Sequence, residues 1–297
     1  MKFDVIHARR IWLTASGILV AASLFCTAVF GLKLGIDFTG GSLMEVKFDG
    51  APTTDVLRSS LESTGQQDVR VQPTNAGGFL IRLPSITEDQ HQTLLSGLKT
   101  QFGNVNELQF QNVGPVFGAE LLRKALWAVV LVLILITLYV AYAFRKVAEP
   151  IASWKYGIVT MIAAFHDIIL PIGLFSILGH FFGYQVDSAF VAAILTVLGY
   201  SINDTIVVFD RIRENLLHRS SADSLEFTVS KSVRQTFVRS INTSMTTLLA
   251  LLAVFFFGGE TTHAFSLALI IGIVSGTYSS IFIASPLLVV WNNWNRR

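Results

Sequence analysis

Six apolar stretches, each long enough to cross a lipid bilayer as a helix, constrain the fold of this chain more than any other feature. About 20 apolar residues at about 1.5 Å each span the ~30 Å hydrocarbon core of a membrane. The stretches lack the period-two alternation of outer-membrane strands, so they predict helices and not a barrel. The predicted fold is an all-α polytopic membrane bundle of six transmembrane helices. The stretches cover residues 11–31, 125–144, 154–178, 189–209, 240–257 and 264–291.

Composition supports the same class. Of the 297 residues, 52% are hydrophobic and 14% charged, which is too apolar for an ordinary soluble domain. The net charge of +2 gives no indication of nucleic-acid binding. A cleaved signal peptide is the alternative for the first stretch, but the stretch exceeds the usual apolar length of about 7–15 residues, which favours an uncleaved anchor. Cys26 is the only cysteine, so an internal disulfide is impossible, and we expect a small packing residue.

Lys and Arg are distributed unevenly between the two sides of the predicted bundle. The short loops around residues 180–187 and 258–263 contain neither. The positive-inside rule therefore predicts that both termini are cytoplasmic. The large loop after the first span is then extracytoplasmic, because long loops translocate largely regardless of their charge. The basic residues assigned to the cytoplasmic side are Lys2, Arg9, Arg10, Arg145, Lys146, Lys155, Arg211, Arg213, Arg219, Lys231, Arg234, Arg239, Arg296 and Arg297.

The chain is expected to divide into residues 1–31 (the N-terminus and first helix), 32–124 (an extracytoplasmic domain) and 125–297 (five further helices). In the middle part, the pattern predicts strands at 42–49, 68–72, 79–83 and 107–113 and helices at 53–64 and 88–102. The order β-α-β-β-α-β predicts a ferredoxin-like α+β domain. Val56, Leu57 and Leu61 are expected on one helical face, and Ser85 and Thr87 are candidate helix caps.

One carboxylate, Asp204, lies inside the fourth apolar stretch. A carboxylate in the bilayer costs at least about 2.5–3.5 kcal/mol on insertion scales unless it finds a partner, a proton or water. With Asn203 beside it, Asp204 is expected to face other helices or a wet cavity. Two interpretations remain: a proton-titrating group beside a cation, or a carboxylate that holds two helices together.

The candidate cation for Asp204 is Arg239, which opens the fifth span in the same cytoplasmic half of the membrane. Because the fourth and fifth spans run antiparallel, Arg239 could extend inward to meet Asp204. The alternative is an interfacial arginine whose side chain extends to the cytoplasmic surface. The sequence alone leaves both open.

Two further polar or small-residue features lie within the predicted helices. His166 and Asp167 form a secondary polar site in the third span, where Pro171 removes the amide that would bond the Asp167 carbonyl. This pair suits a proton path and equally a structural hydrogen bond between helices. In the sixth span, Gly272 and Gly276 have the small-residue spacing that allows close helix packing.

Several motifs are missing from the sequence. The chain has no G-x-x-x-x-G-K-[ST] loop, no HExxH and no G-x-S-x-G, and no cluster of metal-ligand spacing occurs in the 32–124 loop. We therefore expect no enzyme activity, no cofactor, no metal and no nucleotide hydrolysis. The membrane offers another source of energy, because one charge that crosses ~100 mV gains ~2.3 kcal/mol.

Four segments carry a resemblance to a known family: GIDFTGG at 35–41, His166-Asp167, GYSINDTIVVFDRIREN at 199–215, and residues 265–286. In these segments the chain resembles SecF, the smaller of the paired SecD/SecF protein-export subunits of the resistance–nodulation–division superfamily. The resemblance implies a proton-driven machine in the cytoplasmic (inner) membrane, with Asp204 and Arg239 on the proton pathway.

The resemblance also implies partners. Six spans are half of the usual twelve, so a SecD-like membrane subunit should supply the rest. The further partners that the resemblance implies are the SecYEG translocon, the translocating polypeptide and, indirectly, the SecA ATPase. Two alternatives remain: a half-transporter of the same superfamily that exports a small molecule or lipid, and a translocon scaffold without proton chemistry. The 32–124 loop is small for an exporter's porter domain, and the GIDFTGG segment favours the SecF-type function.

Overall fold

The computed structural model describes residues 4–50, 52–64, 66, 69–74, 77–145, 151–220 and 223–294. Contacts between residues divide the chain into two units. The first, called the helix unit, takes the described residues of 1–33, 127–185 and 189–297. The second, called the sheet unit, takes those of 34–126 together with Val186–Ser188.

Six helices of the described chain are long and apolar enough to cross a membrane, which confirms the predicted bundle. The last span is a continuous run of three pieces, because a π-helical segment interrupts the α-helix. In chain order the spans are α1 (Arg9–Phe30), α5 (Pro115–Ala143), α6 (Ser153–Phe182), α7 (Ser188–Leu217), α8 (Leu225–Phe257) and α9 (Glu260–Ser279) with η1 (Ser280–Ala284) and α10 (Ser285–Trp294).

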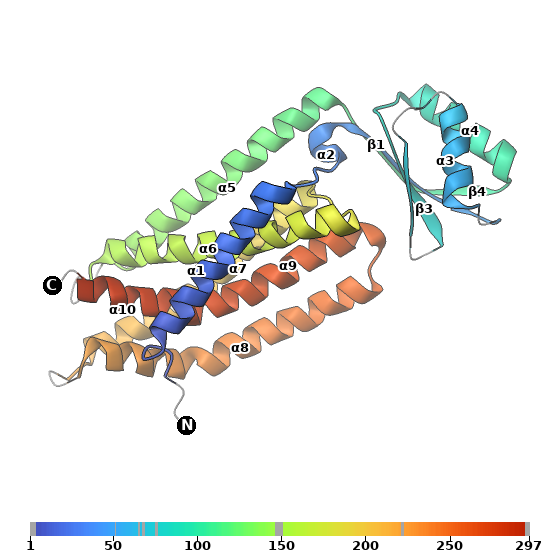
Figure 1. The fold of residues 1–297 in the computed structure, drawn as a ribbon. Helices are drawn as coiled ribbons and strands as arrows, with labels where there is room; N and C mark the ends of the chain where they lie inside the picture. Colours follow the sequence, from blue (N-terminus) through green and yellow to red (C-terminus); the bar gives the residue numbers. More distant parts are fainter. Residues whose placement is uncertain are drawn as a thin grey trace. The chain divides into compact units, whose positions relative to one another are not determined.

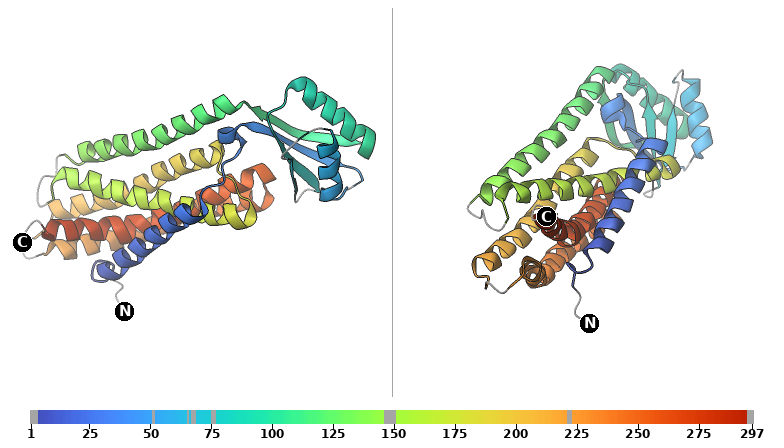
Figure 2. Two further views of the ribbon diagram at one scale, coloured as in Figure 1. Left: turned by 45° about the horizontal axis from the view of Figure 1, so that its top comes forward. Right: turned by 60° about the vertical axis from the view of Figure 1, so that its left-hand side comes forward.

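The spans differ in how much of their surface other helices cover. Most of α6 and of the α9–η1–α10 run is buried, whereas α1, α5 and α8 are largely exposed. Helix α1 packs on α6, and α8 runs beside α9 (Figures 1 and 2). At one end of the bundle the rings of Phe144, Tyr156 and Phe209 pack together and join α6 to α7. The buried core of the helix unit therefore lies around α6, α7 and α9.

The sheet unit has the predicted ferredoxin-like arrangement. Its strands are β1 (Gly41–Phe48), β2 (Arg70–Pro73), β3 (Gly78–Leu83) and β4 (Val105–Val113). They form one sheet in the order β2-β3-β1-β4, and all neighbours are antiparallel. Helices α3 (Thr54–Ser63) and α4 (Glu88–Phe102) cover one face of this sheet (Figure 1), and a one-turn helix, α2 (Ile36–Thr39), precedes β1.

Local signals explain most of the element boundaries in this unit. Thr87 caps α4 and forms a reciprocal capping box with Gln90.

The predicted buried face of α3 was wrong in one residue, because Val56 is half exposed whereas Leu57 and Leu61 are buried. Successive helical residues lie about 100° apart, so Val56 falls outside the face that Leu57 and Leu61 share. Between β2 and β3, residues 75–76 lie outside the described residues, as do Lys2, Lys146, Arg296 and Arg297.

Candidate functional site: two buried carboxylates

Asp204 lies in α7 at the point where three helices meet, and only 9% of its surface is exposed. Its Oδ1 accepts a hydrogen bond from Ser240 Oγ of α8 at 2.6 Å. Its Oδ2 accepts a hydrogen bond from Ser280, the first residue of η1. Among the described residues, Asp204 forms no ion pair. Within the described part of the chain, this carboxylate in an apolar helix is thus held by hydroxyl groups alone.

Hydroxyl partners suit a group that changes its charge. A serine hydroxyl can donate a hydrogen bond to a carboxylate and can accept one from a carboxylic acid, whereas Lys and Arg can only donate. Ser240 and Ser280 can therefore remain in contact with Asp204 in either protonation state. Ser280 also opens a π-helical turn, a feature often found at functional sites.

The structure does not bring Arg239 into an ion pair with Asp204. Arg239 and Asn203 are both exposed, and each directly precedes a buried residue of the site, Ser240 and Asp204. Because one helical residue corresponds to a rotation of about 100°, Ser240 faces Asp204 while Arg239 points away from it. Any effect of the Arg239 charge on Asp204 is therefore exerted without an ion pair.

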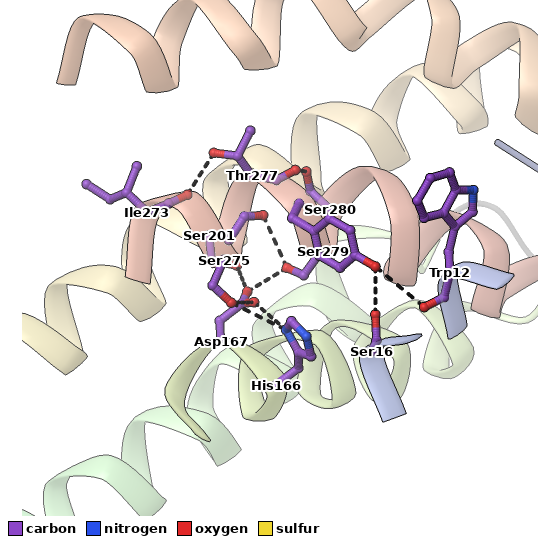
Figure 3. A network of polar contacts seen from close by, with 12 residues as sticks. Trp12, Ser16, His166, Asp167, Ser201, Ile273, Ser275, Thr277, Ser279 and Ser280 are labelled. Carbon is purple, nitrogen blue, oxygen red and sulfur yellow. Dashed lines mark hydrogen bonds and ion pairs between the residues drawn. The ribbon is translucent and has the colours of Figure 1, made fainter. Parts of the chain in front are cut away.

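Asp167 is a second buried carboxylate, and it accepts four hydrogen bonds (Figure 3). Its Oδ1 is bonded by the neighbouring His166 Nδ1 at 2.9 Å and by Ser275 Oγ at 2.8 Å. Its Oδ2 is bonded by Ser201 Oγ at 2.5 Å and by Ser279 Oγ at 2.6 Å. The side chain joins α6, which carries it, to α7 and α9.

His166 is buried beside this carboxylate. Its ring stacks on Tyr278, with the ring centroids 6.0 Å apart. The Tyr278 hydroxyl lies 2.9 Å from Ser16 Oγ and donates to the Trp12 carbonyl at 3.4 Å, so the cluster extends to α1. His166 Nε2 has no hydrogen-bond partner among the described residues. No group of three or more His, Cys, Asp or Glu in that part of the chain could hold a metal ion.

The two carboxylates are anchored at adjacent points of the same two helices. On α7, Ser201 binds Asp167 and lies one turn before Asp204. On the sixth span, Ser279 binds Asp167 and the next residue, Ser280, binds Asp204. These serines were not identified from the sequence as partners of either carboxylate. A usable signal was present, since Ser275 and Ser279 have the i, i+4 spacing that puts two hydroxyls on one helix face.

Gly272 and Gly276 lie where α9 approaches α7 most closely. A Cβ added at Gly272 would be 2.2 Å from Val197 Cγ2, and one at Gly276 would be 2.8 Å from Ser201 Cβ. A larger residue would force the Val197 side chain to shift at Gly272, and would press on the Cα of Ser201 at Gly276. Gly276 lies next to Ser201 and one turn before Ser280, so this approach helps to place both carboxylate partners.

Comparison with known proteins agrees with this geometry. Residues 93–294 match the family described as protein export membrane protein SecD/SecF, C-terminal. The chain belongs to the SecD/SecF family. Residues 27–52 also match the segment described as the SecD/SecF GG motif. The chain is 45% identical to the protein translocase subunit SecF of Thermobaculum terrenum, over 98% of this chain and 94% of the relative. It is 38% identical to the protein translocase subunit SecF of Haemophilus influenzae, over 95% of this chain and 83% of the relative.

A solved structure has the same fold. The crystal structure of SecDF, a translocon-associated membrane protein from Thermus thermophilus, matches all of this chain with a TM-score of 0.84 at 34% identity. The chain spans 39% of the length of that SecDF chain. SecDF in its super-membrane-facing form matches with a TM-score of 0.70 at the same identity. The chain is thus a multi-pass inner-membrane protein of the SecF type.

Proposed function

We propose that this SecF-type subunit uses the proton gradient, together with a SecD-like partner, to promote late translocation and release of secreted polypeptides. Asp204 is the group that takes up and releases the proton. The observation that carries this proposal is its contact with hydroxyls alone, Ser240 and Ser280, in an apolar bundle. Asp167 differs because four donors, one of them His166, occupy both of its oxygens, as expected of a fixed structural carboxylate, whereas each oxygen of Asp204 has one hydroxyl partner.

In this scheme Arg239 and Asn203 line the approach to Asp204. Both are exposed within a span, and each directly precedes a buried residue of the site, Ser240 and Asp204. A rotation of α8 by up to one residue, about 100°, would exchange Ser240 for Arg239 as the nearest α8 side chain, which would favour the charged form of Asp204. Asp167 and His166 then act as a fixed junction between α6, α7 and α9.

The exposed face of α8 supports a partner in the membrane. Arg239, Asn242, Thr243 and Thr246 are exposed at a spacing of about one helical turn. The exposed side chains of α1 and α5 are predominantly apolar, as lipid contact requires, whereas on α8 exposed apolar side chains such as Met245 and Leu249 lie beside this polar stripe. Because polar side chains in lipid are costly, a SecD-like subunit is the proposed cover of the α8 face. Both termini are placed in the cytoplasm by this proposal, and contacts with SecYEG, and indirectly with SecA, would follow from it.

The proton role is tested by export of a precursor into vesicles with and without a proton gradient. Asp204→Asn should remain inserted and bound to its partner, yet should lose the gradient-dependent part of export. Asp210→Asn is the matched control, because Asp210 is an exposed carboxylate on the same helix, 3.2 Å from Arg213. Full export by Asp204→Asn would eliminate the proton relay and favour a translocon scaffold.

The partner is tested by co-purification with a SecD-like chain. Thr246→Trp adds bulk to the polar α8 face and should reduce recovery of the partner. Leu138→Trp places the same side chain on the exposed apolar face of α5 and should leave recovery unchanged. A stable and fully active complex that contains no second six-span chain would contradict the half-motor proposal.

A further inference from the structure

A short segment at residues 35–41, GIDFTGG, connects α1 to β1 and contacts the start of α7 within the sheet unit. The amide of Gly35 donates to the Val186 carbonyl at 2.8 Å. Next to it, Leu34 and Val186 form an isolated parallel bridge. Two stretches about 150 residues apart in the sequence are therefore joined directly before α7 begins.

Asp37 binds the first residue of α7. Its Oδ2 accepts a hydrogen bond from the Ser188 amide at 2.9 Å and a second one from the Ser188 hydroxyl. The first amides of a helix have no partner within the helix, so an acceptor at this end stabilises it. The negative charge of a carboxylate also interacts favourably with the positive end of the helix dipole. Asp37 thus acts as a cap supplied to α7 by a different part of the chain.

The same segment is fixed on its other side. Gly40 has φ 76°, and a Cβ there would lie 2.6 Å from Pro115 Cα. A Cβ at Gly118, in the first turn of α5, would lie 2.8 Å from the Phe38 carbonyl oxygen. Gly41, the last residue of the segment, is also the first residue of β1, which pairs with β3 on one side and β4 on the other. The segment is thus held against the start of α5 and by β1, as well as against α7.

Helix α7 then continues without a break from Ser188 to Asp204. The 16 steps between these two residues, at about 1.5 Å each, correspond to about 24 Å of helix. A continuous α-helix with its backbone hydrogen bonds intact moves nearly as a rigid rod, so a displacement at Asp204 is expected at Ser188 as well.

We propose that Asp37 is a positioning residue that couples α7 to the ferredoxin-like domain. Movement of α7 that accompanies a change at Asp204 reaches the sheet through Ser188, Asp37 and β1. This inference rests on the proposed proton role of Asp204, and it assigns to the GG-motif segment the task of transmitting that movement. Asp37 itself neither binds nor carries the proton.

The local contact is tested by hydrogen–deuterium exchange on the full chain with its partner in a lipid environment. Asp37→Ala should raise exchange at the first turn of α7 about five-fold, the effect of losing a helix cap. Exchange around Asp204 and in α4 should not change. Asp89→Ala is the matched control, since Asp89 is an exposed carboxylate in the first turn of α4. Unchanged exchange at Ser188 in Asp37→Ala would overturn the proposal.

Coupling is tested by the gradient-dependent part of export. Asp37→Ala should lose the larger part of it, whereas Asp37→Asn, which keeps an acceptor oxygen for Ser188, should retain more. A disulfide between Leu34→Cys and Val186→Cys, with Cys26→Ser, replaces the lost contact by a covalent one. In the Asp37→Ala background this disulfide should restore export, and a reductant should abolish the rescue.

The outcomes separate this inference from the proposed function. Loss of gradient-dependent export in both Asp37→Ala and Asp204→Asn, with disulfide rescue of the former alone, supports the coupling. If Asp37→Ala exports fully while Asp204→Asn gains nothing from the gradient, the coupling is overturned and the proton role stands. Full export by Asp204→Asn overturns both.

Discussion

Gly276→Ala tests whether the approach of α9 to α7 sets the geometry of the carboxylate site. The added Cβ would lie 2.8 Å from Ser201 Cβ and 3.2 Å from Ser201 Cα. Carbon atoms in contact prefer separations of about 3.5–4.0 Å, so the two helices must move apart by about 0.7–1.2 Å. Overpacking of this kind costs about 1–3 kcal/mol.

The gain in helix propensity must be subtracted from this cost. Alanine is favoured over glycine in a helix by up to about 1 kcal/mol. Gly17→Ala in α1 receives the same gain, and no atom lies within 4 Å of its added Cβ. The difference in stability between the two variants therefore isolates the overpacking, about 1–3 kcal/mol. At about 2–4 °C per kcal/mol, Gly276→Ala should melt about 2–12 °C below Gly17→Ala.

The assay is thermal unfolding of the purified complex in detergent, followed by tryptophan fluorescence. The same separation of α9 from α7 would stretch the hydrogen bond between Ser280 and Asp204 beyond the usual O–H···O range of about 2.5–3.0 Å. Gradient-dependent export by Gly276→Ala should fall accordingly. If Gly276→Ala melts at the same temperature as Gly17→Ala, the close approach is not a constraint and this reasoning is refuted.

Two further outcomes are expected. Asp167→Asn replaces Oδ2, which accepts hydrogen bonds from Ser201 and Ser279, with an amide nitrogen. At about 0.6 kcal/mol per interhelical hydrogen bond, the variant should be less stable than wild type by about 1 kcal/mol. An unchanged melting temperature would contradict this. Burial alone would raise the pKa of Asp4, but hydrogen bonds from Ser230 and the amides of His7 and Ile6 outweigh it and hold the pKa below its usual 3.8. The contact therefore stabilises the fold above about pH 4 and is lost as the pH falls through the lowered pKa. The stability advantage of wild type over Asp4→Ala should vanish in acid, and an advantage that persists there would contradict the assignment.

Elements whose signals lie within a few residues were predictable. The bounds of α4 follow from the capping box at Thr87 and from Gly103, which ends the helix with φ 78°. The spans were predictable because an apolar stretch of about 20 residues is rarely anything other than a transmembrane helix. Helices α7 and α8 extend well beyond their apolar stretches, to Leu217 and back to Leu225. Hydrophobicity does not mark these extensions, since a helix continues in water wherever its backbone bonds and side-chain packing allow.

The functional site was only partly predictable. Asp204 stands out in the sequence because a carboxylate is costly in a membrane helix, wherever its partner lies. Its partners do not stand out, since Ser240 and Ser280 are ordinary small residues of membrane helices. The choice of Ser240 over the adjacent Arg239 depends on the rotation of α8 about its axis. That rotation is set by packing along the whole helix.

The sequence by itself therefore determined the six spans, the ferredoxin-like order of the sheet unit and the position of the anomalous carboxylate. Each of these depends on periodicity, length or the cost of one residue in its own segment. The tertiary structure alone decided which hydroxyls hold Asp204, that Asp167 shares their helices, and that Asp37 caps α7. These contacts join residues 36 to 151 positions apart in the sequence. Rotating a helix about its axis by the angle of one residue, about 100°, would replace one partner by its neighbour.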